Sequence, residues 1–270
     1  MSFSVSGKTA IVTGAANGLG LAIARHLVDK GASVMFADID EGRLAAEVGE
    51  EAATEGALRL FTGDLTQKLT LANLVSATVD AFDRVDILVN ASRKCSQSDP
   101  LNPESDLVET MWQQNVLTAL RLSQMVAKRM IQTAEKSGVE QGTPIGSIIN
   151  MSAIASLRVQ PQLLGYSIAT AAVEQMTRTL AVALAPHGIR VNAVSIGSVM
   201  SASLMSALKE DPSLRDRIEG GTPLGRIAGP DELSETVQYL ASDASSFVTG
   251  QILAVDGGRG LLDSVAAPTF

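Results

Sequence analysis

The chain opens with a strand, a glycine-rich turn and a helix, in the stretch from Lys8 to Gly20. The apolar run 9–12 predicts a short buried strand, and the apolar spacing over 19–28 predicts a helix. Glycines between the two let the backbone turn sharply and approach a ligand closely. Because a helix start offers unpaired N–H groups and the positive end of a dipole, this turn predicts a site for the pyrophosphate of a dinucleotide.

An acidic residue, Asp38, follows at the end of the next predicted strand, 32–37. It lies about 20 residues beyond the glycine turn, the distance at which a dinucleotide site places a carboxylate on the ribose hydroxyls. Its charge would repel the 2′-phosphate of NADP, and the turn after it has no Arg or Lys to attract one. We therefore expect NAD(H) as the cofactor.

Strands and helices alternate along the rest of the chain. The strands are short and apolar without a polar face, which is typical of a parallel sheet covered on both sides by helices. Further strands are predicted at 57–62, 86–90, 146–151, 189–195 and 251–255. Further helices are predicted at 43–53, 69–82, 163–185 and 231–241, with a polar loop at 92–103, an exposed loop at 133–144 and a polar, mobile-looking, partly helical region at 201–221.

One more predicted helix carries a polar residue in its apolar stripe. The residues at steps of three or four from Val108 to Met130 are apolar or aromatic except Asn115. An unpaired amide in such a stripe would cost about 1–3 kcal/mol. We therefore expect Asn115 to have a hydrogen-bond partner, in either a functional or a structural role.

Composition argues against several classes of partner. The 270 residues are 46% hydrophobic and 19% charged, with a net charge of −8 and no basic run or basic helix face, so neither nucleic acid nor an anionic membrane is expected to bind. The single cysteine, Cys95, cannot form an internal disulfide. The chain shows no signal-peptide pattern and no apolar stretch of about 18 residues, so we expect a cytoplasmic protein without a membrane span.

Several motifs together resemble the short-chain dehydrogenase/reductase family over nearly the whole chain. They are TGAANGLG at 13–20, DL at 64–65, DILVN at 86–90, Asn115, Tyr166 and APHGIRVNAV at 185–194, with TPLGR, FVTGQ and VDGG nearer the C-terminus. The resemblance implies one domain, 1–270, built on a Rossmann-type doubly wound α/β sheet of seven mainly parallel strands. Within that domain, we expect a substrate-loop region at about 197–222.

The resemblance also implies which residues contact the cofactor. Those matching the pyrophosphate turn are Gly14, Asn17, Gly18, Leu19 and Gly20. Asp64 and Leu65 match residues beside the adenine, Asn90 matches one near the adenosine ribose, and Asp38 matches the ribose carboxylate. The implied contacts toward the nicotinamide are Thr170, Gly197 and Val199.

The catalytic residues that the resemblance implies are only partly present. The family uses an Asn, a Ser, a Tyr and a Lys, of which Asn115 and Tyr166 match. Thr170 stands at the Lys position and Ala153 at the Ser position, and Ser152 is expected to point away from the side that its neighbour faces. A tyrosine pKa near 10 must fall by roughly three units, about 4 kcal/mol, for the residue to act as a base near neutral pH, and Thr170 offers no cation for this.

Three hypotheses follow from these departures. In the first, the chain is a working NAD(H)-dependent oxidoreductase acting on an alcohol or carbonyl of a small molecule, with Arg93, Lys94 or Arg158 as a substitute cation. In the second, it is a non-catalytic NAD(H)-binding pseudoenzyme that serves as a sensor or partner subunit. In the third, Tyr166 acts alone as an acid on an already activated substrate, at a rate lower by about two to four decades.

The other candidate residues are assigned structural or bystander roles. His26 lies in the first helix, away from the strand ends, and His187 caps the helix 163–185. Cys95 lies in the loop after the fourth strand, near the expected mouth of the active site, with a reactive thiol as the alternative to a bystander. No spacing of His, Cys and Asp matches a zinc site, so no metal is expected. The small residues of the helix 163–185 are compatible with a homo-oligomer, a dimer or tetramer as is usual in the family, and a hetero-oligomer with a paralogue is the alternative.

Overall fold

A sheet of seven parallel strands forms the centre of the computed structural model, which describes residues 3–52, 56–263 and 265. The strands follow the order β3-β2-β1-β4-β5-β6-β7, and every neighbouring pair is parallel. They are β1 (Thr9–Thr13), β2 (Ser33–Asp38), β3 (Leu58–Thr62), β4 (Ile87–Asn90), β5 (Gly146–Ala153), β6 (Ile189–Ile196) and β7 (Ile252–Val255). The predicted fold class is confirmed, and each strand begins and ends within two residues of its predicted bounds.

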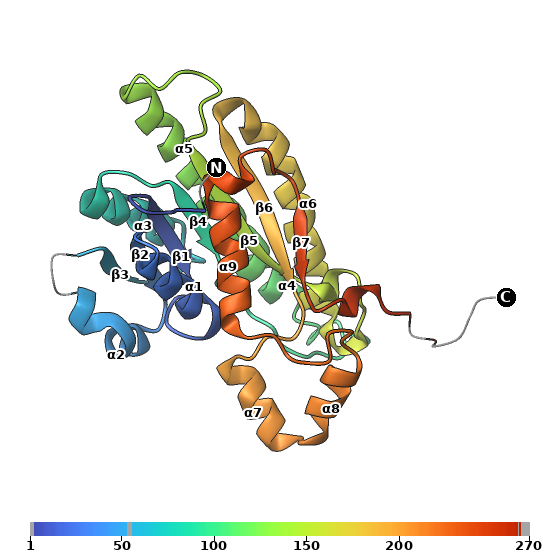
Figure 1. Cartoon of the computed structure of the whole chain (residues 1–270). Coiled ribbons are helices and arrows are strands. Elements are labelled where there is room, and N and C mark those ends of the chain that lie inside the picture. The colour runs from blue at the N-terminus through green and yellow to red at the C-terminus, as the bar shows by residue number, and fades with distance from the viewer. Residues whose placement is uncertain (1–2, 53–55, 264, 266–270) are drawn as a thin grey trace.

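Helices cover both faces of this sheet (Figure 1). The layer on one face consists of α1 (Gly18–Asp29), α2 (Glu41–Ala52) and α9 (Pro230–Ala241). The layer on the other face consists of α3 (Lys68–Phe82), α5 (Thr118–Lys136) and α6 (Leu164–Leu184). Val12 packs into the core of the first layer and its neighbour Ile11 into that of the second, which explains why the strand sequences lack a polar face.

The helix predicted over 108–130 is broken into three pieces in the structure. A short helix α4 (Val108–Met111) leads into a π-helical segment, η1 (Trp112–Leu117), and then into α5. Hydrophobic spacing at steps of three or four does not distinguish a π-helical turn from an α-helical one, so the sequence did not predict this segment. The prediction of an exposed loop at 133–144 is wrong for its first four residues, because α5 continues to Lys136.

Two further helices lie between β6 and α9, in the region that the sequence described as polar and partly helical. They are α7 (Ala202–Glu210) and α8 (Ser213–Gly220), and Figure 1 shows them side by side below the sheet. Single 3₁₀ turns join the other elements: η2 (Ile154–Ser156), η3 (Pro161–Leu163), η4 (Ala185–His187), η5 (Asp243–Ser245) and η6 (Arg259–Leu261). Of the helices that the structure describes, none combines the length and the apolar content needed to cross a bilayer.

The strand order also locates the functional edge of the sheet. The chain moves outward from β1 to β2 and β3 and then returns to β4 on the other side of β1. Open parallel sheets bind ligands outside the carboxyl ends of their strands at such a switch point. The glycine turn after β1 and the loop after β4 both lie at this place.

Candidate active site

The glycine turn after β1 has the backbone geometry of an anion cradle. Gly14 has a φ of +69°, and a Cβ built on it would lie 2.8 Å from the Cα of Ser92. Gly20 is similarly crowded by the carbonyl of Gly14, whereas Gly18, with a φ of +55°, faces open space. Asn17 occupies the N-cap of α1 without a capping side-chain hydrogen bond. The first turn of α1 therefore leaves donor groups and a positive dipole end for a pyrophosphate, and the residues present fit one.

Asp38 closes the same turn from the end of β2. One of its carboxylate oxygens, Oδ2, accepts a hydrogen bond of 3.0 Å from the backbone N–H of Ala16, and Oδ1 accepts one of 3.1 Å from Asp40. These bonds fix the carboxylate beside the glycine turn, and the side chain remains partly exposed. The position suits a group that accepts hydrogen bonds from ribose hydroxyls.

Three further residues of the predicted adenosine end occupy different environments. The carboxylate of Asp64 accepts hydrogen bonds from the backbone N–H and the hydroxyl of Thr66, at 2.9 and 2.8 Å, and these bonds lower the pKa of Asp64. Leu65 is buried. The Asn90 amide is buried and donates to Ser123 Oγ and to Asn150 Oδ1.

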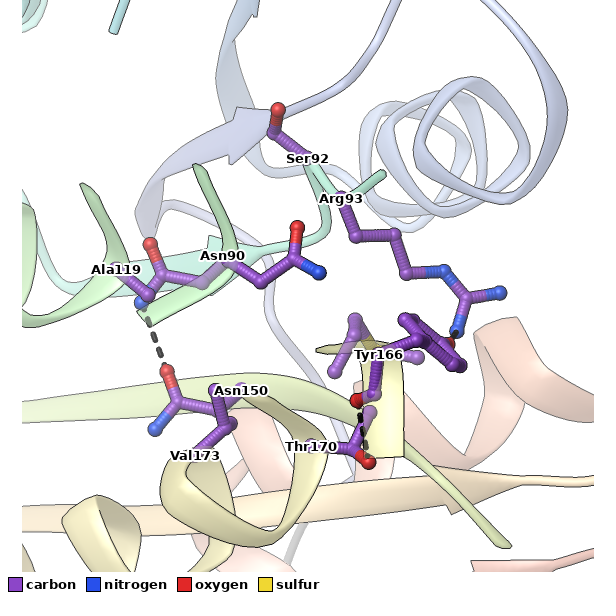
Figure 2. Close-up of a pocket in the computed structure, with 10 residues that line it drawn as sticks. Asn90, Ser92, Arg93, Ala119, Asn150, Tyr166, Thr170 and Val173 are labelled. Atoms are coloured by element: carbon purple, nitrogen blue, oxygen red, sulfur yellow. Dashed lines mark hydrogen bonds between the residues drawn. The ribbon is translucent and has the colours of Figure 1, made fainter. Parts of the chain in front are cut away.

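At the other end of the site, Arg93 and Tyr166 form the central contact. Tyr166 projects from the first turn of α6 and is buried, and Arg93 lies in the loop after β4. The Nη1 atom of Arg93 donates a hydrogen bond of 2.8 Å to the Tyr166 hydroxyl. Figure 2 shows the arginine side chain reaching across from its loop to the tyrosine ring. Of the three cations that the sequence left open, the structure therefore places Arg93 on the tyrosine hydroxyl.

Opposing influences act on the tyrosine. Burial and the nearby Cys95 raise the pKa of Tyr166 above its ordinary value, and the nearby charge and hydrogen bond of Arg93 lower it, with burial the largest influence. The net direction of the Tyr166 pKa is upward. The hydroxyl is therefore protonated near neutral pH and suited to donate its proton.

The residues at the family's Lys and Ser positions are a threonine whose hydroxyl bonds elsewhere and an alanine. The Thr170 hydroxyl donates to the backbone oxygens of Tyr166 and Ser167, both at 3.0 Å, which leaves its proton inside α6. Ser152 is fully buried, and its Oγ donates to Glu174 Oε1 at 3.0 Å. Ser152 thus faces Glu174 of α6, whereas its neighbour Ala153 lines the cavity beside Tyr166.

Asn115 has the hydrogen-bond partners that its place in an apolar stripe required. Its Oδ1 accepts from the backbone N–H of Lys94 and its Nδ2 donates to the Lys94 carbonyl, each at 2.8 Å. The π-helical segment η1 carries Asn115 toward this loop. The Asn115 amide thus holds the backbone next to Arg93, and Lys94 contacts Asn115 through its backbone N–H and carbonyl groups.

Two cavities meet at Tyr166. The smaller, of about 10 Å³ or roughly the room for one water, lies between the strand ends and α6 (Figure 2). Its lining consists of Asn90, Ser92, Arg93, Asn115, Ala119, Asn150, Met151, Tyr166, Thr170 and Val173. The larger cavity measures about 190 Å³, and Arg93, Arg158 and Arg259 line it together with Tyr166.

The last predicted cofactor contacts lie after β6. Gly197 lines the larger cavity, and a Cβ built on it would lie 2.8 Å from the Cα of Asp256, so a side chain is not accommodated there. Val199 is buried and forms a parallel bridge with Ala228. Ser201, the residue at the place of the family's carboxamide-contacting Thr, accepts a bond from Leu204 N–H and caps α7.

The two histidines assigned to structural roles lie away from Tyr166, whereas Cys95 is close enough to raise the pKa of that tyrosine. His26 Nε2 is 2.7 Å from Gln238 Oε1, which joins α1 to α9, and His187 ends the turn after α6. Cys95 is exposed and free. Within the described ranges no group of three or more His, Cys, Asp and Glu side chains is arranged to hold a metal ion.

Sequence reasoning missed two residues of this region. Arg259 lines the larger cavity from η6, and Glu174 supports the end of β5 through Ser152 and Ser156. A signal for Arg259 was available, because it closely follows the last predicted strand, and strand carboxyl ends gather at one edge. Glu174 gave no such signal, since a single acid in a long helix is usually solvated.

Comparison with known proteins agrees with this geometry. A family model described as enoyl-(acyl carrier protein) reductase matches residues 14–259. A cis-4-hydroxycyclohexanecarboxylate dehydrogenase from Sinomonas cyclohexanicum is 35% identical over 252 residues, which are 93% of this chain and 96% of that protein. The chain belongs to the short-chain dehydrogenase/reductase family.

Solved structures extend the likeness. A 7α-hydroxysteroid dehydrogenase complexed with NADH and 7-oxo glycochenodeoxycholic acid is 28% identical with a TM-score of 0.85, and 95% of each chain is covered. A gluconate 5-dehydrogenase from Burkholderia cenocepacia in complex with NADP and tartrate is also 28% identical, with a TM-score of 0.84 and coverage of 97% of this chain and 98% of that one. Members of the family are oxidoreductases that use nicotinamide cofactors on small molecules, and these matches place the chain in that class.

Proposed function

We propose that this chain is an NAD(H)-dependent oxidoreductase acting on the carbonyl or alcohol group of a small molecule, with Tyr166 as the proton-transfer residue. The observation that carries the proposal is the 2.8 Å hydrogen bond from Arg93 to the Tyr166 hydroxyl. It supplies a fixed cation at the oxygen that gains negative charge when the proton leaves. Arg93 then has the role that a lysine has elsewhere in the family, which Thr170 at that position lacks.

The direction of the Arg93 bond also decides where the tyrosine proton points. A guanidinium only donates, so the Tyr166 oxygen accepts from Arg93 and its own O–H is available to a substrate oxygen. Because burial keeps the Tyr166 pKa raised, the protonated hydroxyl prevails near neutral pH, which favours reduction of a carbonyl. NADH would supply the hydride to the carbonyl carbon. Tyr166 gives its proton to the carbonyl oxygen, its phenolate is stabilised by Arg93, and a proton from water restores it.

NAD(H) rather than NADP(H) is proposed because of the groups around the adenosine ribose. The carboxylate of Asp38, held by Ala16 and Asp40, would accept the ribose hydroxyls and repel a 2′-phosphate. The residue after it, Ile39, is 67% exposed and carries no charge. Arg43, the next cation along the chain, pairs with Asp40 at 3.4 Å. The pyrophosphate would lie on Gly14, Gly18 and the start of α1.

The matched relatives support the substrate class of this proposal. One is named for a hydroxyl group on a carbon ring, and the solved steroid dehydrogenase holds a ring ketone together with NADH. In this chain, the apolar lining of the larger cavity, which includes Ile154, Leu163 and Ile196, would accommodate a carbon skeleton beside Tyr166. A small molecule with an alcohol or carbonyl group on such a skeleton is the proposed substrate.

Calorimetry and a substrate panel together test the proposal. Titration with NADH and NADPH should show binding of NADH, and weaker or absent binding of NADPH. A panel of ketones, aldehydes and secondary alcohols should then give turnover coupled to NADH oxidation or NAD reduction. NADH binding without turnover on any substrate would instead favour a non-catalytic binding protein, and a preference for NADPH would contradict the role given to Asp38.

A further inference from the structure

Three arginines from distant parts of the chain line the larger cavity beside Tyr166. Arg93 follows β4, Arg158 follows β5 and the turn η2, and Arg259 begins η6 after β7. Each follows the carboxyl end of a different strand, so the topology of the sheet brings them to one place. The cavity measures about 190 Å³.

The contacts that hold these arginines use uncharged partners. Arg158 donates through Nε, at 2.8 Å, and through Nη2 to the carbonyl of Gly260. Arg259 Nη1 donates to Ser198 Oγ at 2.9 Å, and Arg93 Nη1 donates to the Tyr166 hydroxyl. A guanidinium has five N–H donors, so each of the three retains donors for a ligand.

Carboxylates do not balance this charge. No Asp or Glu lines the cavity, and over the described ranges none of the three guanidinium groups forms an ion pair. The neighbouring acid, Asp256, accepts from the backbone N–H groups of Gly258 and Gly260 and lines a different cavity. Three uncompensated positive charges around one space are a notable local excess in a chain whose net charge is −8.

Like charges around one small cavity repel one another, and an anion placed between them relieves that repulsion. Arginine binds planar carboxylates through two parallel N–H donors, which gives direction as well as charge. The remaining lining is largely apolar and includes Ala153, Ile154, Leu163 and Ile196. The cavity therefore combines a cationic rim with apolar walls.

We propose that the substrate is a small carboxylic acid, a hydroxy acid or oxo acid with an apolar carbon skeleton. Arg158 and Arg259 bind its carboxylate, while Arg93 remains at Tyr166, where the reacting oxygen lies. This inference rests on the proposed function, because it names the substrate class of the same site. In this proposal Arg158 and Arg259 select substrates that carry a carboxylate, and Tyr166 transfers the proton.

Binding of non-reacting probes tests the inference without turnover. Pentanoate and its neutral counterpart pentanamide are titrated into the NADH-saturated protein, or into the protein alone if NADH does not bind. Pentanoate should bind at least about tenfold more tightly than pentanamide, on the scale of one hydrogen bond to an ionised group, and the difference should shrink at high salt. Equal binding of the two probes, or binding of neither, would overturn the inference.

Substitutions then locate the carboxylate. Arg158→Ala and Arg259→Ala should each weaken pentanoate binding about tenfold and leave pentanamide binding unchanged, with partial recovery in the Arg→Lys variants. Lys209→Ala removes an exposed cation of α7 that does not line the cavity and serves as the control. Circular dichroism and Tm confirm that each variant is folded, and Arg→Gln variants replace any that is not. Equal loss for both probes would contradict a carboxylate site.

Turnover distinguishes failure of the inference from failure of the proposed function. Reduction of 4-oxopentanoate is compared with that of its methyl ester. Preference for the acid, lost in the Arg158 and Arg259 variants through a higher KM, supports both proposals. Equal reduction of acid and ester keeps the oxidoreductase but overturns the acid substrate. Selective pentanoate binding without reduction of any compound keeps the anion site and overturns the oxidoreductase.

Discussion

The two ends of the proposed cofactor site differ in how far apart in the sequence their contacting residues lie. At the adenosine end, Asp38 bonds to the turn at Ala16, which is 22 positions away and within one strand–helix–strand unit. At the nicotinamide end, Arg93 and Tyr166 are 73 positions apart and meet only because β4 and α6 are packed around the same sheet. The first end is built by a local motif and the second by tertiary structure.

This difference has a chemical counterpart. The adenosine end consists of backbone N–H groups and one carboxylate, which together recognise groups that do not react. Under the proposed function, the ionisation of side chains at the nicotinamide end decides the reaction, and Arg93 from a loop takes the role that the family gives to a lysine of the helix. Substitutions at the two ends should therefore separate binding of the cofactor from transfer of the proton.

The largest effect is expected from Tyr166→Phe. The change removes the hydroxyl that accepts a hydrogen bond from Arg93 and keeps the buried ring, so turnover should fall by about 10²–10⁴ while NADH affinity changes little. Steady-state kinetics and calorimetry measure the two quantities. Tyr239→Phe is the matched control, because Tyr239 is the other tyrosine of the chain and packs against Phe3. A Tyr166→Phe protein that keeps its rate would transfer the proton through another group.

The features that the sequence predicted are those built locally, as at the adenosine end, and the features that it did not predict depend on tertiary structure, as at the nicotinamide end. The strand positions, the glycine turn and the position of Asp38 were predictable, because apolar runs and glycine spacing act over short distances. The residue that contacts the Tyr166 hydroxyl was not predictable. Arg93, Lys94 and Arg158 all follow strand ends that meet at one edge of the sheet, and the sequence pattern does not tell which of their side chains reaches the tyrosine. The π-helical segment at Asn115 and the charge of Arg259 in the cavity likewise depend on packing between elements.

Asp38→Asn is expected to have the next largest effect, and only on the cofactor. Asparagine keeps an acceptor for the N–H of Ala16 but loses the charge, so NAD(H) should bind roughly ten- to a hundredfold more weakly, as expected for loss of hydrogen bonds to an ionised group. NADPH affinity should rise in the same variant, because the repulsion of its 2′-phosphate is removed. Calorimetry with both cofactors measures the change in preference.

Glu41→Gln is the control for that substitution, since it removes an exposed carboxylate three positions away in the first turn of α2. Its preference for NAD(H) should match that of the unmodified chain. An unchanged preference in Asp38→Asn would mean that the carboxylate serves only to hold the backbone of Ala16 and Asp40, and the cofactor would then be selected elsewhere.

The smallest of the three effects is expected from Arg93→Met, and it should depend on the direction of the reaction. Arg93 lowers the Tyr166 pKa against the larger influence of burial, so its removal raises that pKa further. Alcohol oxidation needs the deprotonated tyrosine, so its rate should fall about tenfold at neutral pH and its acidic limb should move to higher pH. Carbonyl reduction needs the protonated tyrosine, so the alkaline limb of its rate profile should also move to higher pH.

Rate profiles against pH in both directions measure these shifts, with Lys94→Met as the matched control and Arg93→Lys as a partial rescue. If Arg93→Met lowers the rate without moving either limb, the guanidinium does not act on the ionisation of Tyr166, and the likeness to the family's lysine fails.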